Sequence, residues 1–308
     1  EKFYDGIVTK GRAAGGVKTV IFNWALGVVL EWEPSKEGHG LYGFKLKIAR
    51  KLVFSKVKEA LGLTGIKAVA SGSAALQSRL ARFFNGAGIP VLEGYGLTET
   101  SPVVTVNTVN TPGMIKIGSV GKVVPGVEIG FGPDKEILVK GPNVMMGYYK
   151  DEEKTAEVIK DGWFHTGDIG ELDSEGFLRI TDRKKEIFKT SGGKYVAPAL
   201  LENALKASLF IEQVIVVGEY QKHPSALISP NTDTITEWCK RHNHTYPGDT
   251  EIGADKVISD RVMKEVNKLM EPFSPWERVK VIRILPEPFS IEGGELTPTL
   301  KLKRKPIQ

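Results

Sequence analysis

The chain has 308 residues, of which 41% are hydrophobic and 26% are charged, as in a typical folded globular protein. This length is enough for a large core and two domains, which argues against intrinsic disorder. The net charge of +5 favours anionic ligands such as nucleotides or an anionic membrane surface, but no stripe of basic and aromatic residues indicates nucleic acid as a partner.

The single cysteine, Cys239, cannot form a disulfide within the chain, which agrees with a reducing compartment. The longest apolar stretch, residues 17–32, contains Lys18 and Asn23 and is too short for a membrane span, and no secretory signal precedes it. We therefore predict a cytoplasmic protein and leave peripheral association with the inner face of the membrane open. Because the chain starts without methionine, in helix-like sequence, we expect it to be the later part of a longer protein.

The first third of the chain predicts helices and then a strand–helix–strand unit. Apolar residues recur at helical spacing over residues 17–32 and 41–61. The unit comprises an apolar run, a tight glycine turn, a helical pattern and a second strand, at residues 66–70, 71–73, 74–84 and 91–92. Such a unit is half of a doubly wound α/β layer, in which ligands bind beyond the carboxyl ends of the strands.

Short apolar runs between Gly and Pro turns predict a small β subdomain at residues 120–131, 136–140 and 177–181. Residues 177–181 alternate between apolar and polar side chains, and Ser174-Glu175-Gly176 before them supplies the turn of a hairpin. The charged residues 182–185 then break the pattern, and we predict a hinge there.

The residues beyond the hinge predict a compact α+β domain of roughly 120 residues. Helices are expected at 198–207 and 255–270, and strands at 214–218 and 279–285. The buried face of the first helix is predicted to carry Leu200, Leu201, Ala204 and Leu205. The predicted fold is α/β, with part of a large domain over residues 1–182 and a small C-terminal domain over residues 183–308.

An aromatic ring, a glycine, hydroxyls and a carboxylate follow the second predicted strand, in the sequence Tyr95-Gly96-Leu97-Thr98-Glu99. This set suits a nucleoside triphosphate, because the ring can stack on a base, the hydroxyls can contact a phosphate and Glu99 can hold Mg²⁺. The alternatives are an ordinary acid at a helix start for Glu99 and a core ring with an exposed hydroxyl for Tyr95.

Three later features also suit a nucleotide. Asp168 follows Thr166 and Gly167, so its carboxylate is expected on a flexible backbone, where it can accept hydrogen bonds from the vicinal hydroxyls of a ribose. Arg183 can donate to the same sugar or to a phosphate. The glycine-rich residues 190–194 let a ligand approach the backbone. Taken singly, each has an alternative: a turn cap, a solvated charge and a simple turn of the chain.

Other chemistries are disfavoured. Residues 118–122 partly match the phosphate-binding P-loop motif. The match fails because Lys116 stands where the motif has its first glycine and Val123 stands where it has Ser or Thr. The Gly-x-Ser-x-Gly motif of nucleophilic hydrolases does not occur. We do not expect a metal site at His242 and His244, which flank Asn243.

Four motifs, in this order, resemble those of the adenylate-forming superfamily of acyl-CoA synthetases, adenylation domains and luciferases. They are Tyr95 to Glu99, W-F-H-T-G-D at residues 163–168, Arg183 with Lys185, and Ser191-Gly192-Gly193-Lys194. The sequences GYGLTETSP and SGGKYVAP, together with residues 296–304, are most similar to those of the long-chain fatty-acid CoA ligase branch. The resemblance covers essentially the whole chain. The Ser/Thr/Gly-rich loop that wraps the ATP phosphates in this family is expected to precede it.

The resemblance implies a role for each matching residue of the large domain. Ser71-Gly72-Ser73-Ala74 would border the adenine and the acyl pocket, and Tyr95-Gly96 would lie against the adenine. Thr98 would contact the α-phosphate and Glu99 would hold Mg²⁺.

The resemblance assigns the remaining roles near and beyond the hinge. Asp168 would bind the ribose hydroxyls with support from Arg183. Lys185 would be the hinge residue, and Gly192-Gly193 would line the tunnel for the pantetheine of coenzyme A. Lys301 would reach the fatty-acid carboxylate and the α-phosphate.

The implied reaction is the ATP-dependent ligation of a long-chain fatty acid to coenzyme A through an acyl adenylate, with Thr98, Glu99 and Lys301 as catalytic residues. Two alternatives stay open at this point. One is an adenylating enzyme that uses another acid or a carrier-protein thiol, and the other is a fragment that only binds nucleotide or CoA. Without the phosphate-binding loop, we expect the 308 residues alone to be inactive.

Overall fold

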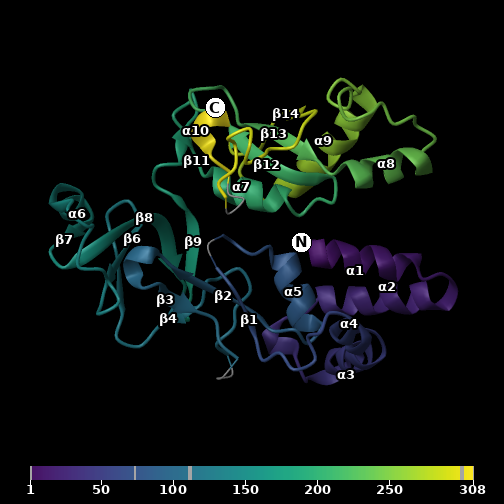
Figure 1. Cartoon of the computed structure of the whole chain (residues 1–308), viewed down its shortest axis with the longest axis horizontal. Helices are drawn as coiled ribbons and strands as arrows, with labels where there is room; N and C mark the ends of the chain where they lie inside the picture. Colours follow the sequence, from purple (N-terminus) through teal and green to yellow (C-terminus); the bar gives the residue numbers. More distant parts are fainter. Residues whose placement is uncertain (1, 73, 110–112, 299–301, 308) are drawn as a thin grey trace. The chain divides into compact units, whose positions relative to one another are not determined.

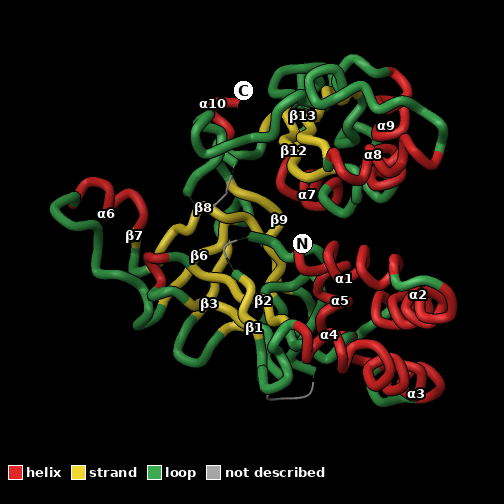
Figure 2. Tube along the Cα trace, turned by 45° about the vertical axis from the view of Figure 1, so that its right-hand side comes forward, coloured by secondary structure: helices red, strands yellow, loops and turns green. Residues whose placement is uncertain are grey.

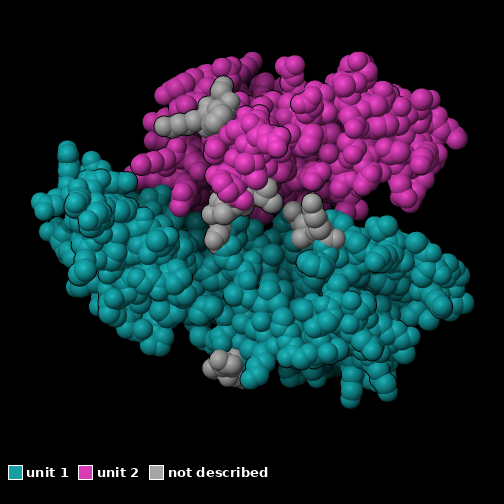
Figure 3. Space-filling model, viewed as in Figure 1, with its two compact units in different colours: residues 1–180 teal, residues 181–308 magenta. Residues whose placement is uncertain are grey.

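The computed structural model describes residues 2–72, 74–109, 113–298 and 302–307. The chain forms two compact units, Glu1–Ile180 and Thr181–Gln308, which are coloured separately in Figure 3. Each unit has hydrophobic core clusters of its own. Across the described ranges, none of the helices combines the length and the apolar character that crossing a bilayer requires.

Five helices gather on one side of unit 1 (Figure 1): α1 (Lys2–Ala13), α2 (Gly16–Leu30), α3 (Gly40–Ala49), α4 (Ser55–Ala60) and α5 (Ser78–Gly86). A π-helical segment, Arg50–Phe54, joins α3 to α4, so the helical pattern predicted over residues 41–61 is confirmed. Phe54 and Phe83 are completely buried between these helices, with their rings edge to face and 5.7 Å apart. The Arg50 guanidinium donates to the carbonyl oxygens of Asn85 and Gly86 and ties the start of this π-helical segment to the end of α5.

The first sheet of unit 1 has the order β1 (Val69–Ser71), β2 (Val91–Gly96), β3 (Val103–Val106) and β4 (Lys122–Val123). β1 and β2 are parallel and α5 connects them, which confirms the predicted strand–helix–strand unit. β3 and β4 are antiparallel to their neighbours, so the sheet is mixed. The predicted start of the first strand at Ile66 is wrong, because its partner strand begins at Val91, opposite Val69. The helix also begins later than predicted, at Ser78.

The second sheet has the order β5 (Glu128–Phe131), β6 (Glu136–Lys140), β8 (Trp163–Leu172) and β7 (Ile159–Lys160), and β9 (Leu178–Arg183) pairs with β8. Figure 2 shows these strands beside the helices of the unit. The β8–β9 hairpin was predicted and is confirmed. β9 continues through Arg183, however, so the charged segment starts inside the strand. The apolar run at 120–131 forms two strands, because Gly126 adopts a φ of +83° in the turn between them.

Unit 2 places helices on a three-stranded sheet (Figures 1 and 2). Its elements are β10 (Phe188–Lys189), β11 (Tyr195–Val196), α7 (Pro198–Leu205), β12 (Ile211–Val217), β13 (Ser225–Pro230), α8 (Thr232–Arg241), α9 (Lys256–Met270), β14 (Val281–Ile284) and α10 (Arg304–Ile307). β13 lies between β12, which is antiparallel to it, and β14, which is parallel. α7 packs against β12, and α9 packs against β14.

All four elements predicted for this domain are present, whereas β13, α8 and the short elements β10, β11 and α10 were missed. The α7 face is partly wrong: Leu201 and Leu205 are buried, but Leu200 is 37% exposed. Leu201 and Leu205 are four residues apart and share one face of the helix, and Leu200 lies off that face.

Candidate functional site

The structure brings Asp168 and Tyr95 together, although 73 positions separate them in the sequence. The Tyr95 hydroxyl donates a hydrogen bond of 2.7 Å to Asp168 Oδ2. Both residues are buried, and the ring of Tyr95 belongs to a core cluster with Val104 and Leu178. The tyrosine thus presents its hydroxyl, rather than an open ring face, to the carboxylate. Contact between this ring and an adenine stays a prediction.

Asp168 lies in an irregular part of β8. Ile169 stands opposite Glu136 of β6, and His165 stands opposite Leu138, so three residues of β8 face one residue of β6. A bulge of this kind re-aims side chains within a strand. The prediction of a flexible backbone at Asp168 is therefore wrong, because the residue lies within a ten-residue strand that pairs with β6 and with β9.

A buried carboxylate that the sequence did not single out fixes this bulge. Glu136 is 7% exposed, and its Oε1 accepts a hydrogen bond of 2.9 Å from the backbone N–H of Gly167, whose φ is +73°. The Thr166 hydroxyl donates to the Ile137 carbonyl oxygen at 2.8 Å and accepts from the Asp168 N–H at 3.1 Å. These bonds satisfy backbone groups that the bulge takes out of the strand ladder.

Thr98 and Glu99 lie on one 3₁₀ turn, η3 (Thr98–Thr100), directly after β2. Thr98 is exposed and Glu99 is partly buried. Glu99 Oε1 accepts a hydrogen bond of 2.9 Å from the Tyr148 hydroxyl. A side chain on Gly96 would overlap the Pro102 carbonyl group, so glycine is required where the chain approaches itself around this turn.

The surroundings of Glu99 fit a Mg²⁺ ion that arrives with a nucleotide. Mg²⁺ prefers oxygen ligands and is usually held by one or two carboxylates together with phosphates and water. Glu99 offers such a carboxylate, and its Oε2 makes no hydrogen bond with the described part of the chain. The described residues contain no group of three or more His, Cys, Asp or Glu side chains that could hold a metal by themselves. Glu99 alone would therefore supply one carboxylate ligand, and phosphate oxygens and water would have to complete the coordination sphere.

The predicted glycine turn after β1 is only partly described. Ser71 is the last residue of β1, while Gly72 and Ala74 are exposed beyond the strand. Ser73 lies outside the described residues. The contact of these residues with adenine or an acyl chain stays a prediction.

Glu93 is the second carboxylate that sequence reasoning passed over. It lies on β2 opposite Ser71, is 8% exposed, and accepts a hydrogen bond of 2.8 Å from the Leu76 N–H. Burial raises the pKa of Glu93 to about 7, although the Leu76 N–H opposes this shift. Glu93 therefore anchors the loop between β1 and α5, which explains why the helix starts later than its apolar pattern suggested.

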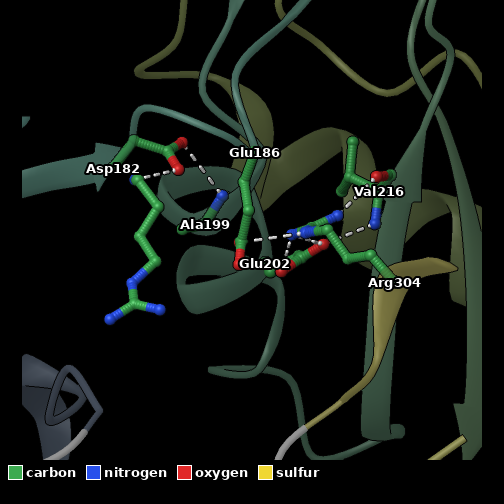
Figure 4. Close-up of polar contacts among 7 residues, drawn as sticks. Asp182, Glu186, Ala199, Glu202, Val216 and Arg304 are labelled. Atoms are coloured by element: carbon green, nitrogen blue, oxygen red, sulfur yellow. Dashed lines mark hydrogen bonds and ion pairs between the residues drawn. The ribbon is translucent and has the colours of Figure 1, made fainter. Parts of the chain in front are cut away.

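The start of unit 2 contains the two basic residues assigned to the hinge. Arg183 ends β9, and both Arg183 and Lys185 are exposed. Asp182, the residue before Arg183 in β9, is buried, and its two carboxylate oxygens accept from the N–H groups of Arg183 and Ala199, at 2.6 and 3.4 Å (Figure 4). Burial raises the pKa of Asp182 to about 6. The start of α7 is thereby fastened to the end of β9.

Gly192 and Gly193 lie in the turn that joins β10 to β11. Gly193 has a φ of +73°, and a Cβ atom built on it would meet no heavy atom within 4 Å. The neighbouring Ser191 N–H donates to the Gln221 carbonyl oxygen at 2.9 Å. The hydrogen bond of Ser191 therefore anchors the turn, and the space beside the backbone of Gly193 is free of other described atoms. Lys301 lies outside the described residues.

Two family models match the chain. The model for AMP-binding enzymes matches residues 39–149, and the model for the C-terminal domain of AMP-binding enzymes matches residues 185–285. The chain belongs to the AMP-binding enzyme family, within the long-chain acyl-CoA ligase branch of the adenylate-forming superfamily.

The chain is similar to named members of this branch. It is 40% identical to the long-chain-fatty-acid–CoA ligase FadD15 of Mycobacterium tuberculosis, over 100% of this chain and 51% of that protein. It is 35% identical to long chain acyl-CoA synthetase 3 of Arabidopsis thaliana, over 99% of this chain and 47% of that protein. The chain thus spans about half the length of these curated relatives.

Solved structures agree on the fold. The adenylation domain of a carboxylate reductase from Mycobacterium chelonae matches with a TM-score of 0.65 at 20% identity, over 94% of this chain and 43% of that chain. The corresponding domain from Segniliparus rugosus, solved with AMP and a carboxylic acid, gives a TM-score of 0.66 at 22% identity, over 94% of this chain and 44% of that chain. At these identities the likeness confirms the predicted α/β fold class alone.

Proposed function

We propose that the protein to which this chain belongs ligates a long-chain fatty acid to coenzyme A, using ATP and an acyl-adenylate intermediate. The observation that carries the proposal is 40% identity over the whole chain to a relative named as a long-chain-fatty-acid–CoA ligase. The buried Tyr95–Asp168 pair supports it, because a fixed carboxylate beside an α/β strand end suits the hydroxyls of a ribose. The relatives' names favour coenzyme A over a carrier-protein thiol.

In the first half-reaction, the fatty-acid carboxylate attacks the α-phosphorus of ATP and pyrophosphate leaves. In the second, the thiol of coenzyme A attacks the acyl carbon and AMP leaves. Asp168 is proposed to hold the ribose with Arg183, and Thr98 to contact the α-phosphate. Lys301 is proposed to neutralise charge on the carboxylate and α-phosphate during the first step.

Glu99 is proposed to hold Mg²⁺, which when bound lowers the charge on the phosphate oxygens. The exposed Lys185 is the proposed hinge residue, and the open turn at Gly192-Gly193 is the proposed guide for pantetheine. Ser71, Gly72, Ser73 and Ala74 are proposed to border the adenine and the acyl chain. A cytoplasmic location, and peripheral contact with the inner membrane face, stay predictions.

Two assays on the full-length protein test this function. Pyrophosphate exchange into ATP is expected to depend on a long-chain fatty acid such as palmitate and to be far weaker with acetate. Thioester formation from palmitate is expected with coenzyme A and not with acyl carrier protein. Exchange that depends on a short or aromatic acid instead would contradict the proposed substrate, and a thioester formed only on carrier protein would contradict the proposed acceptor.

Substituting Asp168 by alanine in this protein is expected to weaken ATP binding by about 1.5–3 kcal/mol, the usual loss for hydrogen bonds to a charged group. Isothermal titration calorimetry with a non-hydrolysable ATP analogue measures the change. Glu171→Ala is the matched control, because Glu171 lies on the same strand but is 53% exposed. Equal affinity of the Asp168→Ala variant and the control would remove Asp168 from the ribose site.

A further inference from the structure

The loop around residues 143–148 docks on the turn that carries Glu99. The Met145 N–H donates to the Glu99 carbonyl oxygen at 2.8 Å, and the Asn143 side-chain amide donates to the Val103 carbonyl oxygen at 2.9 Å. The Tyr148 hydroxyl donates to Glu99 Oε1 at 2.9 Å. The first bond joins the backbones of the loop and the turn, the second ties the loop to the start of β3, and the third reaches the carboxylate.

Tyr148 is itself held by the start of α6 (Glu152–Val158). Its N–H donates to Thr155 Oγ1 at 2.9 Å, and that hydroxyl donates to the Asp151 carbonyl oxygen at 2.7 Å. The Lys154 ammonium lies 4.6 Å from the centre of the phenol ring, within cation–π range.

This arrangement matters because a free glutamate side chain samples several rotamers. Restricting them costs conformational entropy, and a ligand that must restrict them on binding loses affinity. A hydrogen bond from a fixed phenol to Oε1 restricts Glu99 before any ligand arrives. It leaves Oε2, which bonds to none of the described residues, as the oxygen for a cation.

We propose that Tyr148 is a positioning residue, whose hydroxyl orients the Glu99 carboxylate toward the divalent cation that enters with the nucleoside triphosphate. The inference rests on the proposed function, which assigns that cation to Glu99. Tyr148 acts only through Glu99 and contacts neither the cation nor the nucleotide. Partners that orient a metal ligand in this way commonly change metal affinity by 10- to 100-fold when they are removed.

The test uses Mn²⁺ as the probe cation, because its electron paramagnetic resonance signal reports binding without turnover. Tyr148→Phe in the full-length protein removes one hydroxyl and keeps the ring. We expect the affinity for Mn²⁺ in the presence of a non-hydrolysable ATP analogue to fall roughly tenfold. The affinity for the same analogue in EDTA is expected to stay unchanged. Tyr149→Phe is the matched control, since the adjacent Tyr149 is 87% exposed, and it should change neither affinity.

Three outcomes overturn the inference or its basis, and they can be told apart. If Tyr148→Phe binds Mn²⁺ as Tyr149→Phe does, Tyr148 does not position Glu99. If Tyr148→Phe weakens metal-free nucleotide binding as much as Mn²⁺ binding, the residue only supports the loop. If wild type binds the analogue but Glu99→Gln retains full Mn²⁺ affinity, the metal role of Glu99 in the proposed function is wrong, and the inference fails with it.

Discussion

Replacing Arg304 by alanine is expected to lower the free energy of unfolding of unit 2 by about 3–5 kcal/mol. Nη2 of Arg304 lies 2.7 Å from each carboxylate oxygen of Glu202, and its Nε lies 3.0 Å from Glu186 Oε2 (Figure 4). The side chains of Arg304 and Glu202 are only 13% and 11% exposed. The alanine variant would therefore leave a carboxylate without a counter-charge in a site that water barely reaches, and this accounts for the size of the effect.

Hydrogen exchange followed by mass spectrometry measures this loss, because peptides from the two units report their opening free energies separately. Protection is expected to fall in β12 and α7 and to stay unchanged in β2 and β8 of unit 1. Arg241→Ala is the control, since its pair with Glu237 is exposed and contributes about 0–1 kcal/mol. If Arg304→Ala lowers the opening free energy of unit 2 no more than Arg241→Ala does, the buried ion pair contributes little to the stability of this unit.

Arg304 also links two segments that the proposed mechanism uses. It lies three positions after Lys301 in the sequence, and its partner Glu186 follows the proposed hinge residue Lys185. Through Val216, whose carbonyl oxygen accepts from Nη1 at 3.1 Å, the same side chain is fastened to the sheet of unit 2. A rotation about the hinge would then carry the C-terminal segment with the sheet, as one body.

The elements that sequence alone predicted well have strong local signals. α9 combines an N-cap, Asp255, with buried residues at positions 258, 262, 266 and 270, one on each successive turn. In the β8–β9 hairpin, apolar and polar residues alternate over residues 178–181, and a turn with Gly176 precedes them. In contrast, β1 begins at Val69, where it meets the first residue of its partner strand, Val91. A start that a partner 22 positions further along the chain decides cannot be predicted from the sequence of β1 itself.

The candidate site was found by motif, but the interactions that shape it were not. Asp168 and Tyr95 meet across two sheets, and the bulge that aims Asp168 depends on the register between β6 and β8. The sequence did not distinguish Glu93 and Glu136 from exposed acidic residues. Their burial depends on how distant segments pack around them, and the local sequence does not show this packing. The sequence does contain a weak indication that Glu93 is unusual. This acidic residue directly follows the apolar residues that begin β2, a strand whose composition is typical of the protein interior.

The buried position of Glu93 predicts a pH-dependent stability of unit 1. The pKa of Glu93 is about 7 in the folded protein, against an ordinary value of 4.5. Between these values the folded state holds a proton that the unfolded state has lost, so unfolding releases a proton. Stability must therefore fall as the pH rises from about 4.5 to about 7, by about 3 kcal/mol, and level off above that range.

Glu93→Gln removes this dependence, because the amide stays neutral and its oxygen can still accept from the Leu76 N–H. We expect the variant to gain stability relative to wild type by about 2–3 kcal/mol between pH 5 and pH 7.5, measured from the hydrogen-exchange protection of β2. Asp182 is present in both proteins, so its contribution cancels in the difference. Glu128→Gln, at an exposed position of β5, should show no such gain. A stability difference between Glu93→Gln and wild type that is constant across this range would mean that Glu93 is ionised throughout it. The loop between β1 and α5, which borders the proposed adenine site, would then be anchored by a carboxylate at every working pH.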